Sequence, residues 1–431
     1  MKKSLRVVGV LGVIICFFGL CLVISANRGR NVDIEAMRKA GAITTIEDWN
    51  ARLPKVGEDA FAPYKEVWSD VARLSAHQRT SILTTDLFVK LQNRSGAAGA
   101  QDAITIDSHL KAVLNDARRA SEMPRYVLPY KPDGVDYRDA EGILFAGRLL
   151  GACAYTESKS GHMDEAFDDF RRIGKLLAQM RTDLNYSSRL NYSTVNGELL
   201  LLLEAVVREH SNDPSTLAKV IKVIDGLPPL RDLEDDLKSE ALDSLYGIRQ
   251  AEQDPNKYLD GTDFVDSRAN KKITPWGRVH VHLLFNKAIH LQRVLYESMP
   301  KDHRDWRGVQ QALFDADKRA TDLAPLGAGA RPYLSDEVAV GDWVQQIARR
   351  RMVLSCAKIL LSRLDQRRLP GELLPFDQDA IDPFTNALFH YSVKGDSFEI
   401  ASQPLGFNFS QGETFKFKNL QPLPIRADGR K

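Results

Sequence analysis

The sequence predicts a mainly α-helical protein with an N-terminal transmembrane helix and a small C-terminal β element. Three observations predict this class: an uncharged run from Val7 to Ala26, apolar residues recurring at three- and four-residue steps, and short alternating segments after Pro370. Of the 431 residues, 43% are hydrophobic. The chain can therefore bury a sizeable core.

The N-terminal run has the length of a membrane-spanning helix. From Val7 to Ala26 it holds about 20 residues, which as a helix extend about 30 Å. Lys2, Lys3 and Arg6 precede it, which favours a cytoplasmic N-terminus. We therefore predict a single-pass protein of the inner (cytoplasmic) membrane, attached through residues 7–26, with its bulk extracytoplasmic. A cleaved signal peptide is the alternative.

The rest of the chain divides by composition. We predict a cytoplasmic tip and signal anchor over residues 1–30, a linker over 31–60, a helical body over 61–370, and a tail with short β-strands over 371–431. Basic residues (59) nearly balance acidic ones (57), so a nucleic-acid partner is not expected.

The pattern of the helical body predicts antiparallel helix pairs. Ala140–Ser158 is apolar and rich in small residues, Gly161 interrupts it, and Met163–Met180 resumes the helical pattern. Small residues followed by a short Gly turn and a second amphipathic helix are typical of tetratricopeptide-like pairs. Leu199–Val207 and Leu217–Ile224 form a second such pattern. No strict 34-residue period is present, so we predict an array that is repeat-like in style.

The tail contains two hairpin signals. Phe389–Val393 and Phe398–Ala401 flank Lys394-Gly395-Asp396, which predicts a tight β-hairpin. Phe407–Phe409 and Phe415–Phe417 alternate apolar and polar residues around Gln411-Gly412-Glu413, and predict a second hairpin.

Three histidines are the weak candidates for a metal site. His280 and His282 flank Val281, and His290 follows in the same helical segment. On a helix, residues two apart diverge by about 200°, and no acidic residue lies nearby in sequence to complete a site. We therefore predict no metal, no cofactor and no catalytic residues. A tethered metal-dependent hydrolase stays open as the alternative, should folding bring distant carboxylates to the histidines.

Several charged and thiol residues are predicted to be structural. Asp168-Asp169 and Arg349-Arg350-Arg351 lie in helical patterns and are expected on solvated helix faces. Cys153 and Cys356 lie in apolar helical contexts, where buried free thiols are expected. Whether these two cysteines pair stays open at this point.

The tail resembles a known type of protein. The segment from Leu354 to Leu374, followed by Ile381-Asp-Pro-Phe-Thr-Asn-Ala-Leu-Phe-His-Tyr391 and Asp396-Ser-Phe-Glu-Ile400, looks like the end of uncharacterised bacterial membrane-anchored helical proteins. It is also similar to the C-terminal half of type II secretion pseudopilins, in which an Asp-Pro-aromatic turn precedes a terminal sheet. True pseudopilins carry a Glu in the N-terminal apolar helix, and Val7–Ala26 has none. The resemblance implies architecture and location, and leaves a pseudopilin-like secretion accessory as a second alternative.

The Asp-Pro-Phe-Thr turn is predicted to have a structural role. Pro383 fixes its own φ and keeps Asp382 out of the helical region. Asp382 can then accept a downstream amide in an Asx-turn, and Phe384 can anchor the hairpin. Taken together, the sequence predicts a protein of the bacterial cell envelope that binds or scaffolds a protein partner.

Overall fold

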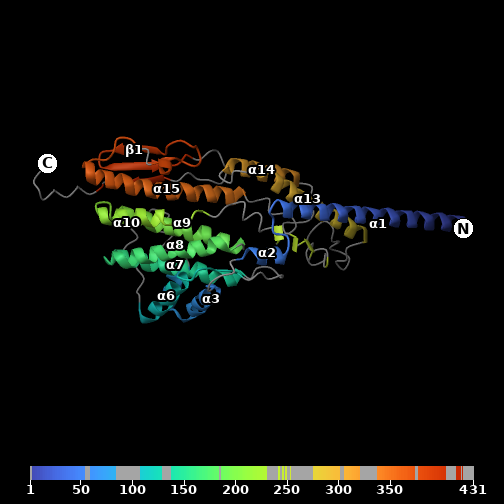
Figure 1. Ribbon diagram of the computed structural model, residues 1–431, viewed down its shortest axis with the longest axis horizontal. Helices are drawn as coiled ribbons and strands as arrows, with labels where there is room; N and C mark the ends of the chain where they lie inside the picture. Colours follow the sequence, from blue (N-terminus) through green and yellow to red (C-terminus); the bar gives the residue numbers. More distant parts are fainter. Residues whose placement is uncertain are drawn as a thin grey trace, which may run out of the picture. The chain divides into compact units, whose positions relative to one another are not determined.

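The computed structural model describes most of the chain. The described residues are 2–53, 59–83, 107–128, 137–183, 186–230, 275–300, 305–320, 337–373, 377–403, 414–418 and 420, with a few positions between 241 and 253. Side chains before residue 20 lie outside this description. The chain is mainly helical and carries a small three-stranded sheet near its C-terminus (Figure 1). The predicted class, mainly α with a C-terminal β element, is confirmed.

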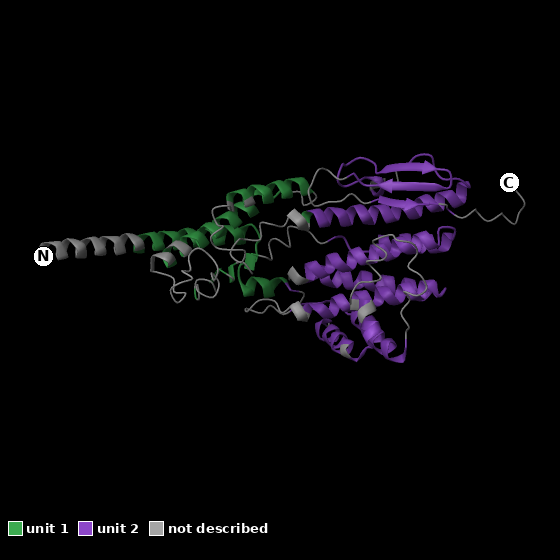
Figure 2. Cartoon of the chain, turned by 180° about the vertical axis from the view of Figure 1, so that it is seen from behind, with its two compact units in different colours: residues 1–52, 232–340 green, residues 53–231, 341–431 purple. Residues whose placement is uncertain are grey.

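Two compact units divide the chain, and each is built from two stretches of sequence. Unit 1 comprises residues 1–52 and 232–340, and unit 2 comprises residues 53–231 and 341–431 (Figure 2). The chain therefore leaves unit 2 after its first helices and returns to it with a long helix.

Unit 1 contains α1 (Lys2–Lys39), α2 (Ile46–Arg52), α13 (Pro275–Ser298) and α14 (Trp306–Ala320). The C-terminal part of α1 packs against α13. Asp33 lies 3.2 Å from Nε of Arg293 and 3.3 Å from Nδ1 of His290, and Met37 is fully buried. Polar contacts and a buried apolar side chain therefore both hold this end of α1.

The predicted membrane anchor is wrong. No helix in the described ranges is both long enough and apolar enough to cross a membrane. Helix α1 does not end with the apolar run from Val7 to Ala26, but continues unbroken to Lys39 through a charged segment that packs on protein. The predicted inner-membrane localisation and extracytoplasmic bulk depended on that anchor and are corrected with it.

Unit 2 holds most helices of the predicted body, whereas α13 and α14 belong to unit 1. The described helices of unit 2 are α3 (Phe61–Asp70), the 3₁₀ turn η1 (Val71–Arg73), α4 (Ala76–Leu83), α6 (Ser108–Ser121), α7 (Tyr137–Lys159), α8 (Met163–Thr182), α9 (Tyr186–Glu209), α10 (Pro214–Asp225) and most of α15 (Glu337–Gln366). Helix α7 packs against α3, α8 and α9, and α8 packs against α9 and α10. Helices α7 and α8 thus form the centre of this unit.

Local sequence sets the ends of these helices. Gly161, with φ of +81°, makes the turn between α7 and α8, where a residue with a Cβ would be strained. Asp107 caps α6 by accepting from the Leu110 amide at 2.8 Å. Asp213 caps α10 by accepting from the Ser215 amide at 3.0 Å, directly before Pro214 at the first turn.

The sheet has the order β1 (His390–Lys394), β2 (Ser397–Ala401), β3 (Thr414–Phe417), all antiparallel. The first hairpin is confirmed: Lys394 pairs with Ser397 around Gly395-Asp396. Gly395 has a φ of +60°, which fits the first central position of a type II′ turn. The second predicted hairpin falls partly on residues 404–413, outside the described chain, and β3 pairs with β2.

Candidate functional site

The outer face of the C-terminal sheet is polar and rich in cations. Because side chains alternate along a strand, the register brings His390, Ser392 and Lys394 of β1 onto one face with Glu399 of β2 and Lys416 of β3. The three β1 residues are exposed. In Figure 1 the sheet lies along α15, so its other face is the one directed to the helices.

The inner face of the sheet is apolar and fastened to the helical body. Phe398, Ile400, Phe415 and Phe417 are buried, and the rings of Phe398 and Phe417 stack at 4.6 Å between centroids. The guanidinium of Arg208 from α9 lies 4.5 Å from the centre of the Phe417 ring and donates to the Lys416 carbonyl. Helix α9 therefore holds the end of β3.

Asp382 organises the turn that leads into β1. Its Oδ1 accepts from the Phe384 amide at 2.9 Å, the hydrogen bond of an Asx-turn, and its Oδ2 accepts from the Gln403 amide at 2.8 Å. The Ser402 hydroxyl donates to the same carboxylate at 3.1 Å. Asp382 and Phe384 are both buried. One carboxylate thus joins the segment before β1 to the segment after β2.

Helix α15 supports this turn from below. Arg351 donates to the Ile381 carbonyl at 2.8 Å, Ser355 donates to the Asp379 carbonyl at 3.1 Å, and Lys358 pairs with the Asp379 carboxylate at 2.8 Å. Burial lowers the pKa of Arg351. These bonds fix the base of the sheet to a long rigid element.

The prediction that the arginine run forms a solvated face is wrong for two of its members. Arg350 is largely buried and donates to the carbonyls of Ile224, Leu227 and Pro228 at 2.7–3.1 Å, where it caps the C-terminus of α10. Arg351 contacts the turn described above.

A shallow hollow of about 340 Å³ lies on the sheet. It is lined by Ser392, Lys394, Ser397, Phe398, Glu399, Lys416, Phe417 and Lys418. Glu399 pairs with Lys416 at 3.3 Å, whereas Lys394 and Lys418 have no carboxylate partner among the described residues. The hollow therefore presents these two lysines beside an exposed strand.

The three candidate histidines do not form a metal site in the described part of the chain. His290 contacts Asp33 at 3.3 Å, His282 is half-buried, and the side chain of His280 lies outside the described residues. No cluster of three or more His, Cys, Asp or Glu side chains suited to a metal ion occurs among the residues that were described. The position of His290 is explained by its contact with α1.

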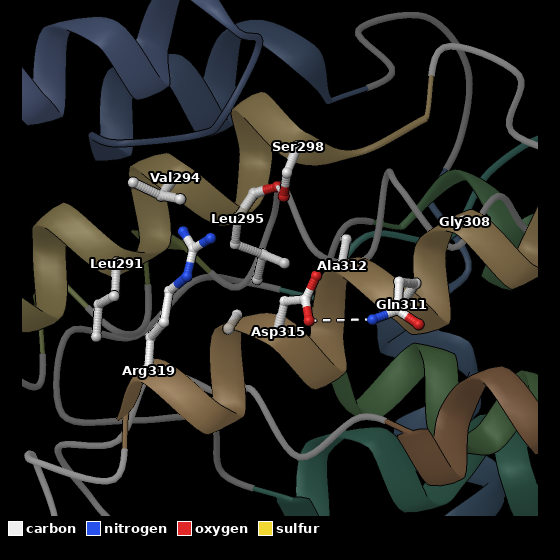
Figure 3. A pocket seen from close by; sticks show the side chains of 10 residues that line it. Leu291, Val294, Leu295, Ser298, Gly308, Gln311, Ala312, Asp315 and Arg319 are labelled. Carbon is white, nitrogen blue, oxygen red and sulfur yellow. Dashed lines mark hydrogen bonds between the residues drawn. The ribbon is translucent and has the colours of Figure 1, made fainter.

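A second hollow, of about 210 Å³, lies between α13 and α14 in unit 1. Leu291, Leu295, Ala312 and Ala316 provide its apolar lining, and Figure 3 shows the Arg319 side chain directed toward α13. Asp315 accepts from the Gln311 amide group at 3.0 Å. This is a small groove between two adjacent helices.

The interior of unit 2 contains an ion cluster that sequence reasoning missed. Asp169 of α8 is fully buried, and accepts from Nε and Nη2 of Arg118 at 2.8 and 2.6 Å and from Arg172 at 2.8 Å. Arg118 also pairs with Glu157 at 3.1 Å. The prediction of a solvated Asp168-Asp169 pair is therefore wrong for Asp169. The signal was its position three residues after Ala166 and four before Ile173, on the buried stripe.

The two cysteines of the body form no disulfide. Cys153 and Cys356 are both buried. Burial raises the pKa of the Cys153 thiol, and the nearby Asp169 and Glu157 charges raise it further. A thiol in this environment is a packing group.

Comparison with known proteins gives no family. No protein-family model matches the chain, and no curated protein or solved structure matches it. The resemblance of the tail to pseudopilins and to bacterial helical proteins therefore stays a prediction.

Proposed function

We propose that this protein binds a protein partner through the outer face of its C-terminal sheet, with the helical body as the scaffold that holds this face in place. The observation that carries the proposal is a pair of exposed lysines, Lys394 and Lys418, that have no carboxylate partner among the described residues. They lie at an exposed strand and a hollow of about 340 Å³. Exposed cations on a fixed surface favour recognition of an acidic partner.

The rigidity of the support strengthens the proposal. Asp382 ties both ends of the first hairpin together, and α15 and α9 hold the sheet through Arg351, Lys358 and Arg208. A binding surface that is already ordered loses less conformational entropy on association.

The helical body suits a scaffold of tetratricopeptide-like style. Helices α7 and α8 are joined by the turn at Gly161 and pack along each other, and α9 and α10 are joined through the Asp213-Pro214 start. Stacked antiparallel helix pairs of this kind create extended surfaces for protein partners. Buried polar side chains of the body bond to one another, as Arg118 does to Asp169 and Asn196 to Gln346, which supports a structural role for these residues.

Site-specific crosslinking in the cells that make the protein tests the proposal. A photoreactive amino acid at Ser392 of the full chain should capture a protein, and the double variant Lys394→Glu, Lys418→Glu should abolish the capture. The matched control is Lys111→Glu, Lys222→Glu, which makes the same change of charge at two exposed positions on α6 and α10. Equal loss in both double variants, or no captured protein at Ser392, would overturn the proposal.

A further inference from the structure

We propose that the partner inserts an extended acidic segment beside β1, adding a fourth strand to the sheet. This inference deepens the proposed function and rests on it. It commits to one mode of recognition: backbone hydrogen bonds give the affinity, and alternating side chains give the choice of partner.

The hairpin register shows which backbone groups of β1 point outward. In a two-residue hairpin the residues that flank the loop form a hydrogen-bonded pair, here Lys394 and Ser397. Pairs then alternate, so Ser392 bonds to Glu399, whereas the N–H and C=O groups of Tyr391 and Val393 point away from β2.

A neighbouring bond supports this assignment. The Phe389 amide, two residues before Tyr391, donates to the Ala380 carbonyl at 3.0 Å, on the side away from β2. The segment at Ala380 therefore covers the start of this edge. Beyond it, β1 is the terminal strand of the described sheet, and four of its five residues are exposed.

Such an edge can accept another strand. Tyr391 and Val393 together offer two N–H donors and two C=O acceptors in extended geometry. The Tyr391 hydroxyl donates to the Pro370 carbonyl at 3.0 Å, which fixes this residue from the inner side. The edge is thus ordered before any partner arrives.

Charge selects the class of segment. On the outer face of β1, the Lys394 ammonium would lie beside the outward side chains of the new strand, and opposite charges across strands are favourable. Glutamate or aspartate at alternate positions fits this face. Apolar residues fit the positions between, next to Val393, which is 36% exposed.

The same charges argue against a second copy of this chain as the occupant. Pairing of β1 with β1 would bring the Lys394 side chains of two copies onto one face, where like charges are unfavourable. Lysine on an edge strand is a common device against self-association. An acidic strand would instead place carboxylates beside Lys394, where the interaction is attractive.

The probe for the test is a fluorescein-labelled, end-blocked peptide, Val-Glu-Val-Glu-Val-Glu, titrated against the full chain by fluorescence anisotropy. We expect it to bind, and we expect Val-Lys-Val-Lys-Val-Lys to bind at least about tenfold more weakly. A version of the acidic peptide with N-methyl groups at alternate amides lacks the N–H donors on one edge. When that edge faces β1, we expect the peptide to lose binding, although the protein is unchanged.

Val393→Pro provides the matching change in the protein. Proline removes the outward N–H of Val393 but no bond to β2, so the hairpin should persist, whereas Val393→Thr keeps the N–H. We expect at least about a tenfold loss of affinity for the acidic peptide with Val393→Pro and less than about twofold with Val393→Thr. Lys394→Glu gives an independent readout that does not alter the backbone.

The outcomes separate the two proposals. Unchanged affinity for both the N-methylated peptide and Val393→Pro would overturn strand addition, while capture at Ser392 that depends on Lys394 and Lys418 would leave the proposed function standing. If no protein is captured at Ser392 and the acidic peptide does not bind the unaltered chain, both the proposed function and strand addition are overturned. Peptide binding to Lys394→Glu as strong as to the unaltered chain would overturn the acidic class of the segment.

Discussion

Asp169 and Asp382 are two buried carboxylates whose surroundings differ in kind. Asp169, in the helical interior, is held by the cations Arg118 and Arg172. Asp382, beneath the sheet, is held by the neutral amides of Phe384 and Gln403 and by a hydroxyl. The backbone groups inside a helix already bond to one another, so α8 joins its neighbours through side chains. An irregular turn has backbone amides outside this pattern, which a carboxylate can accept from.

The difference indicates where each region can change without unfolding the other. The ion cluster joins α6, α7 and α8, and its loss affects the whole unit. The Asp382 network joins local segments around the sheet, so its loss should affect the candidate binding surface first.

The largest expected effect is at Asp169. Asp169→Ala leaves Arg118 and Arg172 without their shared acceptor, and we expect it to lower the free energy of unfolding by about 3 kcal/mol. Urea denaturation followed by circular dichroism measures this. Asp116→Ala is the control, because Asp116 pairs with Arg119 on the exposed face of α6 and should change stability little. Equal effects of the two substitutions would contradict the account.

Asp382→Ala should have the next largest effect. It leaves the buried amide of Phe384 and the Gln403 amide without their acceptor, at a cost of about 2 kcal/mol. Hydrogen exchange should show faster exchange in β1 and β2, with α7 and α8 unchanged. Asp382→Asn keeps one acceptor oxygen and should therefore lose less stability than Asp382→Ala. Uniform loss of protection across the unit would show that the sheet is not a separate local region.

Gly395→Ala is expected to cost about 1 kcal/mol, because a residue with a Cβ is strained at a φ of +60°. No atom lies near the position that the new Cβ would take, so the cost comes from the backbone alone. Gly371→Ala is the control: its φ lies outside the left-handed region and its surroundings are also open. Thermal unfolding of the two variants compares them, and similar midpoints would contradict the turn assignment.

Glu157→Gln should have the smallest effect, with a sign that depends on pH. Burial, with the Asp169 charge, raises the pKa of Glu157 in the folded protein above its ordinary value, although Arg118 opposes the shift. The ionised carboxylate therefore costs stability above the folded pKa, and this cost disappears as the pH falls below the unfolded value of 4.5. We expect Glu157→Gln to be slightly more stable than the unaltered chain at pH 7 and to lose this advantage near pH 4. Urea denaturation at both pH values measures it, and a clear destabilisation at pH 7 would contradict it.

Sequence periodicity predicted the regular elements well where one apolar stripe faces one core. The predicted segments Ala140–Ser158 and Met163–Met180 correspond to α7 and α8, and the predicted hairpin corresponds to β1 and β2. Gly161 and Gly395 mark the two turns because both have positive φ.

Residues whose partners are distant in sequence could not be predicted in the same way. In the sequence, Asp169 is one of two adjacent acidic residues. Its partner Arg118 lies 51 positions earlier, and only the fold brings the two together. In the sequence, Arg350 belongs to a run of three arginines. In the fold it donates to carbonyls at the end of α10. The apolar run in α1 predicted a membrane span from hydropathy alone, whereas α1 continues beyond that run to Lys39 through charged residues and no helix in the described ranges qualifies as a span.

The most direct test of the central claim is hydrogen exchange of the full chain with and without the partner captured at Ser392. We expect added protection at the amides of Tyr391 and Val393, with α7, α8 and the groove between α13 and α14 unchanged. Protection centred on α13 and α14, with the β1 amides unaffected, would contradict it.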